Sequence, residues 1–288
     1  MTPELWQAWS LNPWALGLLA ALGAAYWWLA SGRWQRGGAA YAAALGLLAL
    51  VEFSPLHYLG MHALFSAHMV AHVLLLLLAG PLLVLGLPPH PTPRAAAALH
   101  RFSTWLGPRA WLGWGAGVGI MWLLHVPAVF DASFAGMDQP WSPLPLLHPA
   151  LMLVAGALFS WPLFGPVAAG EDEAAGAGAR LHPLAGVLYL FTACVACSLL
   201  GMLITFAPFG TYLHYYLAAN PAAAAAPHHL VAAVPFGLSL LEDQQAAGLI
   251  MWVPCCLLYL GGCLYLIGQY FSLPAPPAVA APGQPAGA

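Results

Sequence analysis

The chain has 288 residues, of which 62% are hydrophobic and only 5% are charged, and its formal net charge is −3. Because a soluble domain usually carries about 25% charged residues, this composition excludes an ordinary soluble protein and predicts an integral membrane protein. The six basic residues are all arginine, and so few cations cannot neutralise a phosphate backbone. We therefore expect the bilayer as a partner and no nucleic acid.

Seven apolar stretches are each long enough, at about 20 residues, to cross a bilayer as a helix. They lie near residues 13–30, 39–59, 63–86, 109–129, 146–166, 184–206 and 244–268. We therefore predict the all-α class, a polytopic integral membrane protein whose residues 1–270 form a single seven-transmembrane-helix bundle. A shorter apolar piece near 229–241 is predicted to be interfacial or re-entrant. The tail 271–288, rich in proline, alanine and glycine, is predicted to be disordered.

The arginines predict how these spans are oriented. All of them fall in or beside the first, third and fifth loops, which lie on one side of the membrane: Arg33, Arg36, Arg94, Arg101, Arg109 and Arg180. The positive-inside rule makes that side cytoplasmic. We therefore expect the N-terminus outside and the C-terminus in the cytoplasm.

Histidines gather at the opposite, outer side. His68 and His72 stand four residues apart near the start of the third span, so they share one helix face. Polar side chains at this depth normally face the interior of the bundle and mark a pathway or a site. The histidines at or near the outer face are His57, His62, His68, His72, His125, His148, His214, His228 and His229.

The donor types at this depth indicate a metal or haem site around His68 and His72. Imidazole suits copper, zinc, iron and nickel, whereas a thioether favours Cu(I). Asp243 begins the last span, and Met251 follows two turns deeper on about the same face. The alternative for any single histidine is a hydrogen bond to a neighbouring helix or a place among the lipid headgroups.

Other reactive side chains lie inside the spans. Glu52 is the one acidic residue well inside a span, and it could carry protons, orient a ligand histidine, act as a general base or simply reach water. The cysteines all lie in apolar runs, so no disulfide is predicted. Cys194, Cys197 and Cys255–Cys256 could form a thiolate Cu(I) site, although buried free cysteine more commonly behaves as a small hydrophobe.

Five blocks of sequence, by their order and spacing, resemble the multi-span CtaG family of bacterial assembly factors for haem-copper cytochrome c oxidase. The blocks are SPLHYLGMHALFSAHMVAHVLLLLLAGPLLVLGLP (54–88), WLLHVPAVFDASF (122–134), HPALMLVAGALFSWPLFGP (148–166), LLGMLITFAPFGTYLHYY (199–216) and LEDQQAAGLIMWVP (241–254). The resemblance implies a seven-helix, multi-pass protein of the bacterial plasma membrane that an active oxidase requires.

The resemblance also implies a task and a set of site residues. The task is to supply copper to the oxidase's buried copper centre, with an oxidase subunit as partner and a copper donor at the outer face. Two departures from the family pattern stand out, at Ala71, where we expect glutamine, and at Cys255–Cys256, where we expect glycines. Carried over by motif, the site residues are His57, His68, His72, His125, His148, Asp243, Gln244, Gln245, Met251 and Trp252.

These observations favour a non-enzymatic assembly factor that holds copper, as Cu(I), at the outer face. The metal ligands would come from His68, His72, His57, His125, His148, Met251 and Asp243, and Glu52, Gln244 and Gln245 would support them or carry protons. One alternative is a membrane zinc enzyme in which histidine-bound zinc activates water and Glu52 or Asp243 is the base. The other is a haem-binding electron carrier, in which His68 or His72 would pair with a histidine of another helix.

Overall fold

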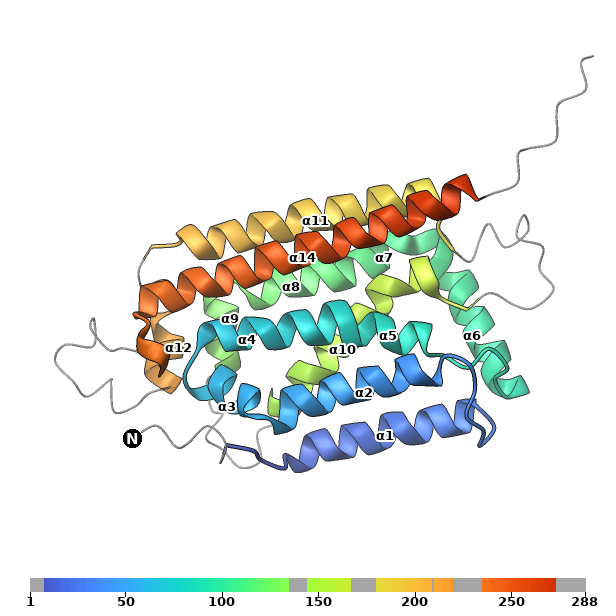
Figure 1. Ribbon diagram of the computed structural model, residues 1–288, viewed down its shortest axis with the longest axis horizontal. Coiled ribbons are helices and arrows are strands. Elements are labelled where there is room, and N and C mark those ends of the chain that lie inside the picture. Colours follow the sequence, from blue (N-terminus) through green and yellow to red (C-terminus); the bar gives the residue numbers. More distant parts are fainter. Residues whose placement is uncertain (1–7, 135–143, 167–179, 209, 220–234, 273–288) are drawn as a thin grey trace, which may run out of the picture.

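The computed structural model describes residues 8–134, 144–166, 180–208, 210–219 and 235–272 (Figure 1). Throughout these ranges the chain forms helices and no strand, which confirms the all-α class. Residues 273–288 of the predicted tail and residues 229–234 of the short piece lie outside the described residues, whereas Phe271 still belongs to the last helix. The helices are α1 (Pro13–Leu29), α2 (Gly38–Phe53), α3 (Pro55–His62), α4 (Phe65–His72), η2 (Val73–Ala79), α5 (Gly80–Leu85), α6 (Pro93–Leu106), η3 (Gly107–Arg109), α7 (Ala110–Trp114), η4 (Gly115–Gly119), α8 (Ile120–Leu124), α9 (Pro127–Phe134), α10 (Leu144–Phe164), α11 (Pro183–Phe206), α12 (Leu213–Ala219), η7 (Pro235–Gly237) and α14 (Leu240–Phe271).

Several helices are suited to a membrane by length and composition. Four are long and apolar enough to cross it, namely Phe65–Leu85 (α4, η2 and α5), Leu147–Phe164 in α10, α11 and α14. The bent pair α2–α3 makes a fifth if it crosses as one unit, and α1 is a shorter apolar helix. On α11, Leu188 is 63% exposed and Phe191 59% exposed. Because contiguous apolar surface of this kind is unfavourable in water, the outward-facing side chains agree with a lipid environment.

The predicted span 39–59 is broken, and the break positions two polar residues. α2 ends at Phe53 and α3 begins at Pro55, with an angle of 53° between them. Pro55 has no N–H and its ring clashes with the preceding turn, so it cannot continue α2. The Ser54 hydroxyl accepts a hydrogen bond from the Leu56 N–H at 3.2 Å and caps α3 instead. Glu52 therefore lies on one side of the bend and His57 on the other.

The segment α4–η2–α5 lies in the middle of the bundle (Figure 1) and packs against α2, α3, α10 and α14. The part directly after His72, η2, is π-helical. Pro81 follows it and cannot donate a hydrogen bond to the carbonyl one α-helical turn earlier, so a wider turn at this point is reasonable. Single π-helical segments inside α-helices occur frequently at functional sites. In this chain the segment begins where the paired histidines end.

A close approach of two glycines brings α10 against this central segment. A Cβ atom on Gly80 would lie 2.6 Å from the Cα of Gly156, and a Cβ on Gly156 would collide with the backbone of Leu76. Small residues of this kind let helix backbones approach in membranes. The crossing matters because α10 also carries His148, and it sets how near that histidine comes to α4.

We expect Gly156→Ala to lower the stability of the protein by about 2 kcal/mol or more, because overpacking in a tight crossing forces the backbones apart. Thermal unfolding in detergent measures this change. Gly23→Ala on α1 is the matched control, since a Cβ there meets no atom within 4 Å. Equal unfolding temperatures for the two variants would mean that the crossing is loose.

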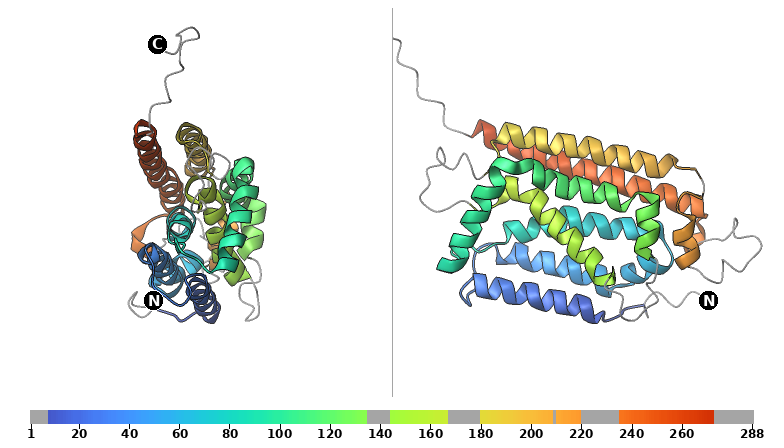
Figure 2. Two further views of the ribbon diagram at one scale, coloured as in Figure 1. Left: turned by 90° about the vertical axis from the view of Figure 1, so that its right-hand side faces the viewer. Right: turned by 180° about the vertical axis from the view of Figure 1, so that it is seen from behind.

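The two ends of the bundle differ in chemistry. The arginines lie in the α1–α2 connection, in α6 and η3, and just before α11, all at the end where α6 lies (Figure 1). His68, His72, His125 and His148 lie towards the opposite end, where α3, α9 and α12 gather. Seen along the helices, the α11–α14 pair and α1 stand at opposite sides of the bundle (Figure 2).

Candidate metal centre

Three histidines from two helices form a group whose ligand atoms all lie within 4.8 Å of one another. His68 and His72 come from one face of α4, as their spacing predicts, and His148 comes from the beginning of α10. His68 is 5% exposed and His72 is 1% exposed, while His148 is partly exposed. A metal with bonds of about 2.0–2.1 Å to nitrogen requires ligand atoms closer together than 4.8 Å, a difference that small side-chain rotations can supply.

The closest pair in this cluster has a polar contact that a metal ion could replace. His72 Nε2 and His148 Nε2 are 2.8 Å apart, so one ring must donate its N–H to the other. The second nitrogen of His72, Nδ1, is buried and has no hydrogen-bond partner among the described residues. A buried polar atom without a partner costs about 1–3 kcal/mol. The rings are thus held together by a shared proton, in surroundings that satisfy His72 only in part.

A fourth histidine lies beside this group together with a thioether. His125 Nδ1 is 2.6 Å from the carbonyl oxygen of Met121. Because a carbonyl can only accept, Nδ1 must carry the hydrogen, and in a neutral ring Nε2 then presents its lone pair. That lone pair faces the sulfur of Met69 at 3.1 Å. Imidazole nitrogen and thioether sulfur, both without a proton to share, are the donor set that suits Cu(I).

Met69 was not among the residues predicted from the sequence. It lies between the paired histidines on α4, it is fully buried, and the rings of His72 and His125 are 5.0 Å apart by their centroids. Helix periodicity places residue 69 about 100° around the helix from residue 68, so the pattern alone gave no reason to add it to the cluster. The signal that could have identified Met69 is its thioether, a soft metal ligand in the same helical turn as His68 and His72.

We expect Met69→Leu to weaken Cu(I) binding about tenfold, in the range seen when one supporting group of a metal site is removed, while Zn²⁺ binding changes little. Leucine keeps the volume, so stability should fall by less than about 1.5 kcal/mol. Competitive titration with a Cu(I) chelator and with a Zn²⁺ chelator measures both affinities. Equal losses for the two metals would show that Met69 shapes the site rather than binding copper.

Asp243 lies at the N-terminus of α4, with both carboxylate oxygens engaged. The backbone N–H of Phe65 donates to Oδ2 at 2.7 Å and that of Ser66 to Oδ1 at 3.2 Å, and the Ser66 hydroxyl donates to Oδ1. The Tyr216 hydroxyl donates to Oδ2 at 2.8 Å. α4 has no capping side chain of its own, so a carboxylate from α14 caps it and also opposes the helix dipole. The residue thereby fixes the helix that carries His68 and His72.

The predicted supporting residues are arranged around the cluster at different distances. His57 Nδ1 lies 3.5 Å from Glu52 Oε2, and Asn12 Nδ2 donates to the same oxygen at 3.5 Å. Gln244 is buried and donates to the carbonyls of Ile204 and Ala207 at the end of α11. Glu52 and Gln244 thus connect helices around the site.

The remaining predicted residues are less central. Met251 is fully buried in the same hydrophobic core as Met69, whereas Gln245 is exposed. His62 and His214 are exposed at the same end of the bundle. His228 and His229 lie outside the described residues.

Aromatic side chains enclose the histidines. The ring of Phe130 packs edge-on against His68 at 5.6 Å between centroids. The Tyr212 hydroxyl donates to the carbonyl of His125 at 3.1 Å. Burial, together with the nearby Asp131, raises the pKa of Tyr212 to about 12, so this donor keeps its proton at neutral pH. The enclosure keeps water from the ligands and holds the His125 backbone in place.

The fold and the cluster define a class of protein: a helical membrane protein with a group of histidines whose ligand atoms lie within 4.8 Å of one another, as in a candidate metal site. A family model described as cytochrome c oxidase caa3 assembly factor (Caa3_CtaG) matches residues 21–272, and the chain belongs to this family. The match covers most of the chain and confirms the resemblance seen in the five sequence blocks. No curated protein and no solved structure shows a significant match.

Proposed function

We propose that this chain is a non-enzymatic assembly factor that binds Cu(I) in the histidine cluster and passes it to a subunit of cytochrome c oxidase. Membership of the assembly-factor family supports the part of the proposal that concerns cytochrome c oxidase. The observation that supports copper binding is the group of His68, His72 and His148. A buried nitrogen without a hydrogen-bond partner among the described residues, such as His72 Nδ1, is costly to keep, so a function other than folding best explains the cluster.

Three features favour Cu(I) as the cargo. The Met69 thioether beside His125 is a soft donor that Zn²⁺ does not prefer. In addition, the carboxylate of the predicted ligand Asp243 is occupied in capping α4, which leaves neutral donors for a monovalent ion. Finally, a site of neutral nitrogen and sulfur ligands tolerates low coordination numbers, so one ligand can be exchanged for a ligand of the receiving subunit.

We further propose a seven-span topology in the bacterial plasma membrane, with the N-terminus outside and the C-terminus in the cytoplasm. α1, the bent pair α2–α3 and the segment α7–η4–α8 would add three spans to the four that meet the criteria of length and composition. The positive-inside rule places the arginine end in the cytoplasm. Copper would then reach the cluster from the outer face, and His148, which is partly exposed, would meet it first.

The alternatives need different geometry. A haem held by His72 and His148 would need its iron between two nitrogens that are in direct hydrogen-bond contact at 2.8 Å. A zinc enzyme needs three protein ligands, an open position and a base near the bound water. The two acids predicted as that base are already engaged, since Glu52 pairs with His57 and Asp243 caps α4.

The test is complementation in cells that lack the gene, with oxidase activity and the copper-to-haem ratio of the purified oxidase as readouts. Wild-type chain should restore both, whereas His68→Ala/His72→Ala should leave an oxidase that contains haem but is deficient in copper. His214→Ala, which removes an exposed histidine at the same end, is the matched control. Normal copper content in an oxidase assembled with the double variant would overturn the proposal.

A further inference from the structure

Two cysteines meet where α11 packs along α14, on a part of the bundle that the proposed function does not use. The Sγ atoms of Cys194 and Cys256 are 3.5 Å apart. This is much longer than a disulfide bond of about 2.05 Å, so both remain thiols. Each is partly exposed. The two helices pack together along most of their length (Figures 1 and 2), so the pair is set in a fixed framework.

A short hydrogen-bond chain orients these thiols. The Ser198 hydroxyl donates to the carbonyl of Cys194 at 2.8 Å, and Ser198 Oγ lies 3.1 Å from Cys256 Sγ. Because the Ser198 hydroxyl proton is already donated to the Cys194 carbonyl, the Cys256 S–H can donate to Ser198 Oγ. The Cys194 S–H can in turn donate to Cys256 Sγ. All three side chains thus have a partner. A small hydrophobe would need none of these contacts.

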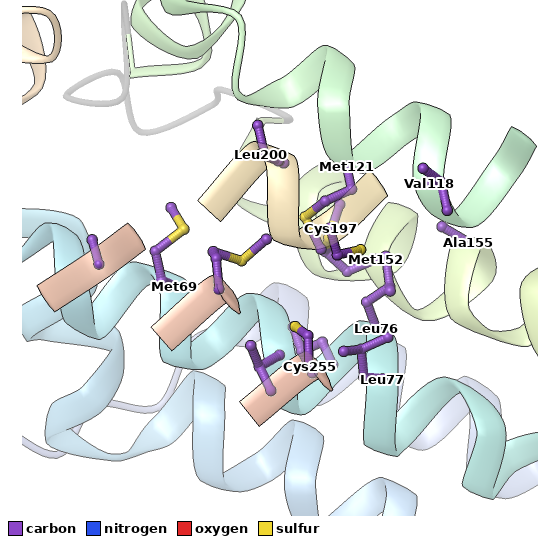
Figure 3. Packing of buried hydrophobic residues seen from close by; sticks show 14 of the residues in the cluster. Met69, Leu76, Leu77, Val118, Met121, Met152, Ala155, Cys197, Leu200 and Cys255 are labelled. Carbon is purple, nitrogen blue, oxygen red and sulfur yellow. The ribbon is translucent and has the colours of Figure 1, made fainter. Parts of the chain in front are cut away.

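More sulfur lies in the adjoining core. Cys197 and Cys255 are buried in the same core cluster as Met121 and Met152 (Figure 3). Cys197 Sγ contacts the Tyr259 hydroxyl at 3.6 Å. On the buried face of α14, Cys255 follows Met251 by one helical turn. Soft donors therefore continue from the depth of the histidine cluster towards the middle of the bundle.

We propose that Cys194 and Cys256 are the ligands of a second metal site, which is specific for a soft monovalent ion, and that this ion is Cu(I). Thiolate is a soft ligand that suits both Cu(I) and zinc, but a pair of sulfur ligands satisfies the low coordination of Cu(I), whereas a structural zinc site takes four ligands. Binding converts one thiol to thiolate and releases that proton to the solvent. Loss of a single proton per Cu(I) leaves the copper–sulfur unit neutral, which surroundings of low polarity favour.

This site goes beyond the proposed function, because it does not require the histidine cluster to bind metal. In the full pathway it would receive or store copper deeper in the membrane than His68 and His72 lie. The two sites use different ligands and different helices, so variants separate them.

The test is anaerobic Cu(I) titration of the full-length protein in detergent, with bicinchoninate as competitor and thiolate-to-copper charge-transfer absorption recorded in parallel. Cys194→Ser/Cys256→Ser should lose one equivalent of Cu(I) and the charge-transfer band. His68→Ala/His72→Ala should retain both of these features. Cys263→Ser is the matched control, since this thiol lies on α14 outside the pair and donates to the Val187 carbonyl instead.

Equal copper stoichiometry and equal absorption in wild type and the double cysteine variant would overturn the second site. If the double variant does not fold, Cys256→Ser alone removes one of the two ligands and gives the same comparison. If copper binds to neither the cysteine site nor the histidine site, both proposals fail. If His68→Ala/His72→Ala lowers the copper stoichiometry but keeps the thiolate-to-copper charge-transfer band, the result supports the cysteine site independently of the histidine cluster.

Discussion

Replacing His68 and His72 together by alanine should lower the Cu(I) affinity of the histidine cluster by more than about 100-fold, because loss of even an outer supporting group typically costs a metal site 10–100-fold. Only His148 would remain of the group within 4.8 Å. The same change should leave the fold intact, since it removes an unsatisfied nitrogen of His72 as well as a contact. Competitive titration measures the affinity, and thermal unfolding checks the fold.

The control for this prediction is His214→Ala, an exposed histidine on α12 whose removal should change neither quantity. A second comparison, His125→Ala, should weaken copper binding while preserving part of it. If the double variant binds Cu(I) as tightly as the wild type but unfolds at a lower temperature, the paired histidines serve the structure and the copper proposal is wrong.

Replacing Asp243 by alanine should destabilise the protein by about 3 kcal/mol, because hydrogen bonds to a charged group contribute about 1.5–3 kcal/mol and the donors left behind are buried. The backbone N–H groups of Phe65 and Ser66 would lose their acceptor, whereas the Tyr216 hydroxyl would keep the Leu240 carbonyl at 3.2 Å. Asp243→Asn should fall between alanine and wild type, since one acceptor oxygen remains. Gln245→Ala, an exposed neighbour on α14, is the control.

This prediction also separates the two roles open to Asp243. A capping residue affects Cu(I) affinity through the position of α4, so Asp243→Asn should lower the affinity by less than about tenfold. A direct copper ligand would give a loss as large as that of His68→Ala/His72→Ala, with little change in stability. The second pattern would return Asp243 to the ligand set predicted from the sequence.

Helical architecture could be predicted from the sequence because apolar length and arginine position report directly on a membrane environment. The break at Ser54–Pro55 was harder to place, since proline is also tolerated within membrane helices when neighbouring groups satisfy the backbone. Spacing of four residues predicted that His68 and His72 share a face of one helix. It could not predict that His148 meets them, because that contact depends on the Gly80–Gly156 crossing of α10 and α5.

The assignments that spacing could not supply all depend on tertiary contacts. Asp243 is 178 residues from its capping partner Phe65, and no local pattern links the start of α14 to the start of α4. Met69 reads as a core residue until His125, from another helix, is placed 3.1 Å from its sulfur. The sequence therefore predicts which side chains could bind a metal and how deep they lie in the membrane. It does not predict which of these side chains contact one another.

The most direct test of the central claim is an anomalous difference map from crystals of the protein loaded with Cu(I), recorded at the copper absorption edge. We expect a peak within bonding distance of His68, His72 and His148, accompanied by separation of the two Nε2 atoms that are now 2.8 Å apart. Copper found only elsewhere, with His72 and His148 still in hydrogen-bond contact, would contradict the proposal.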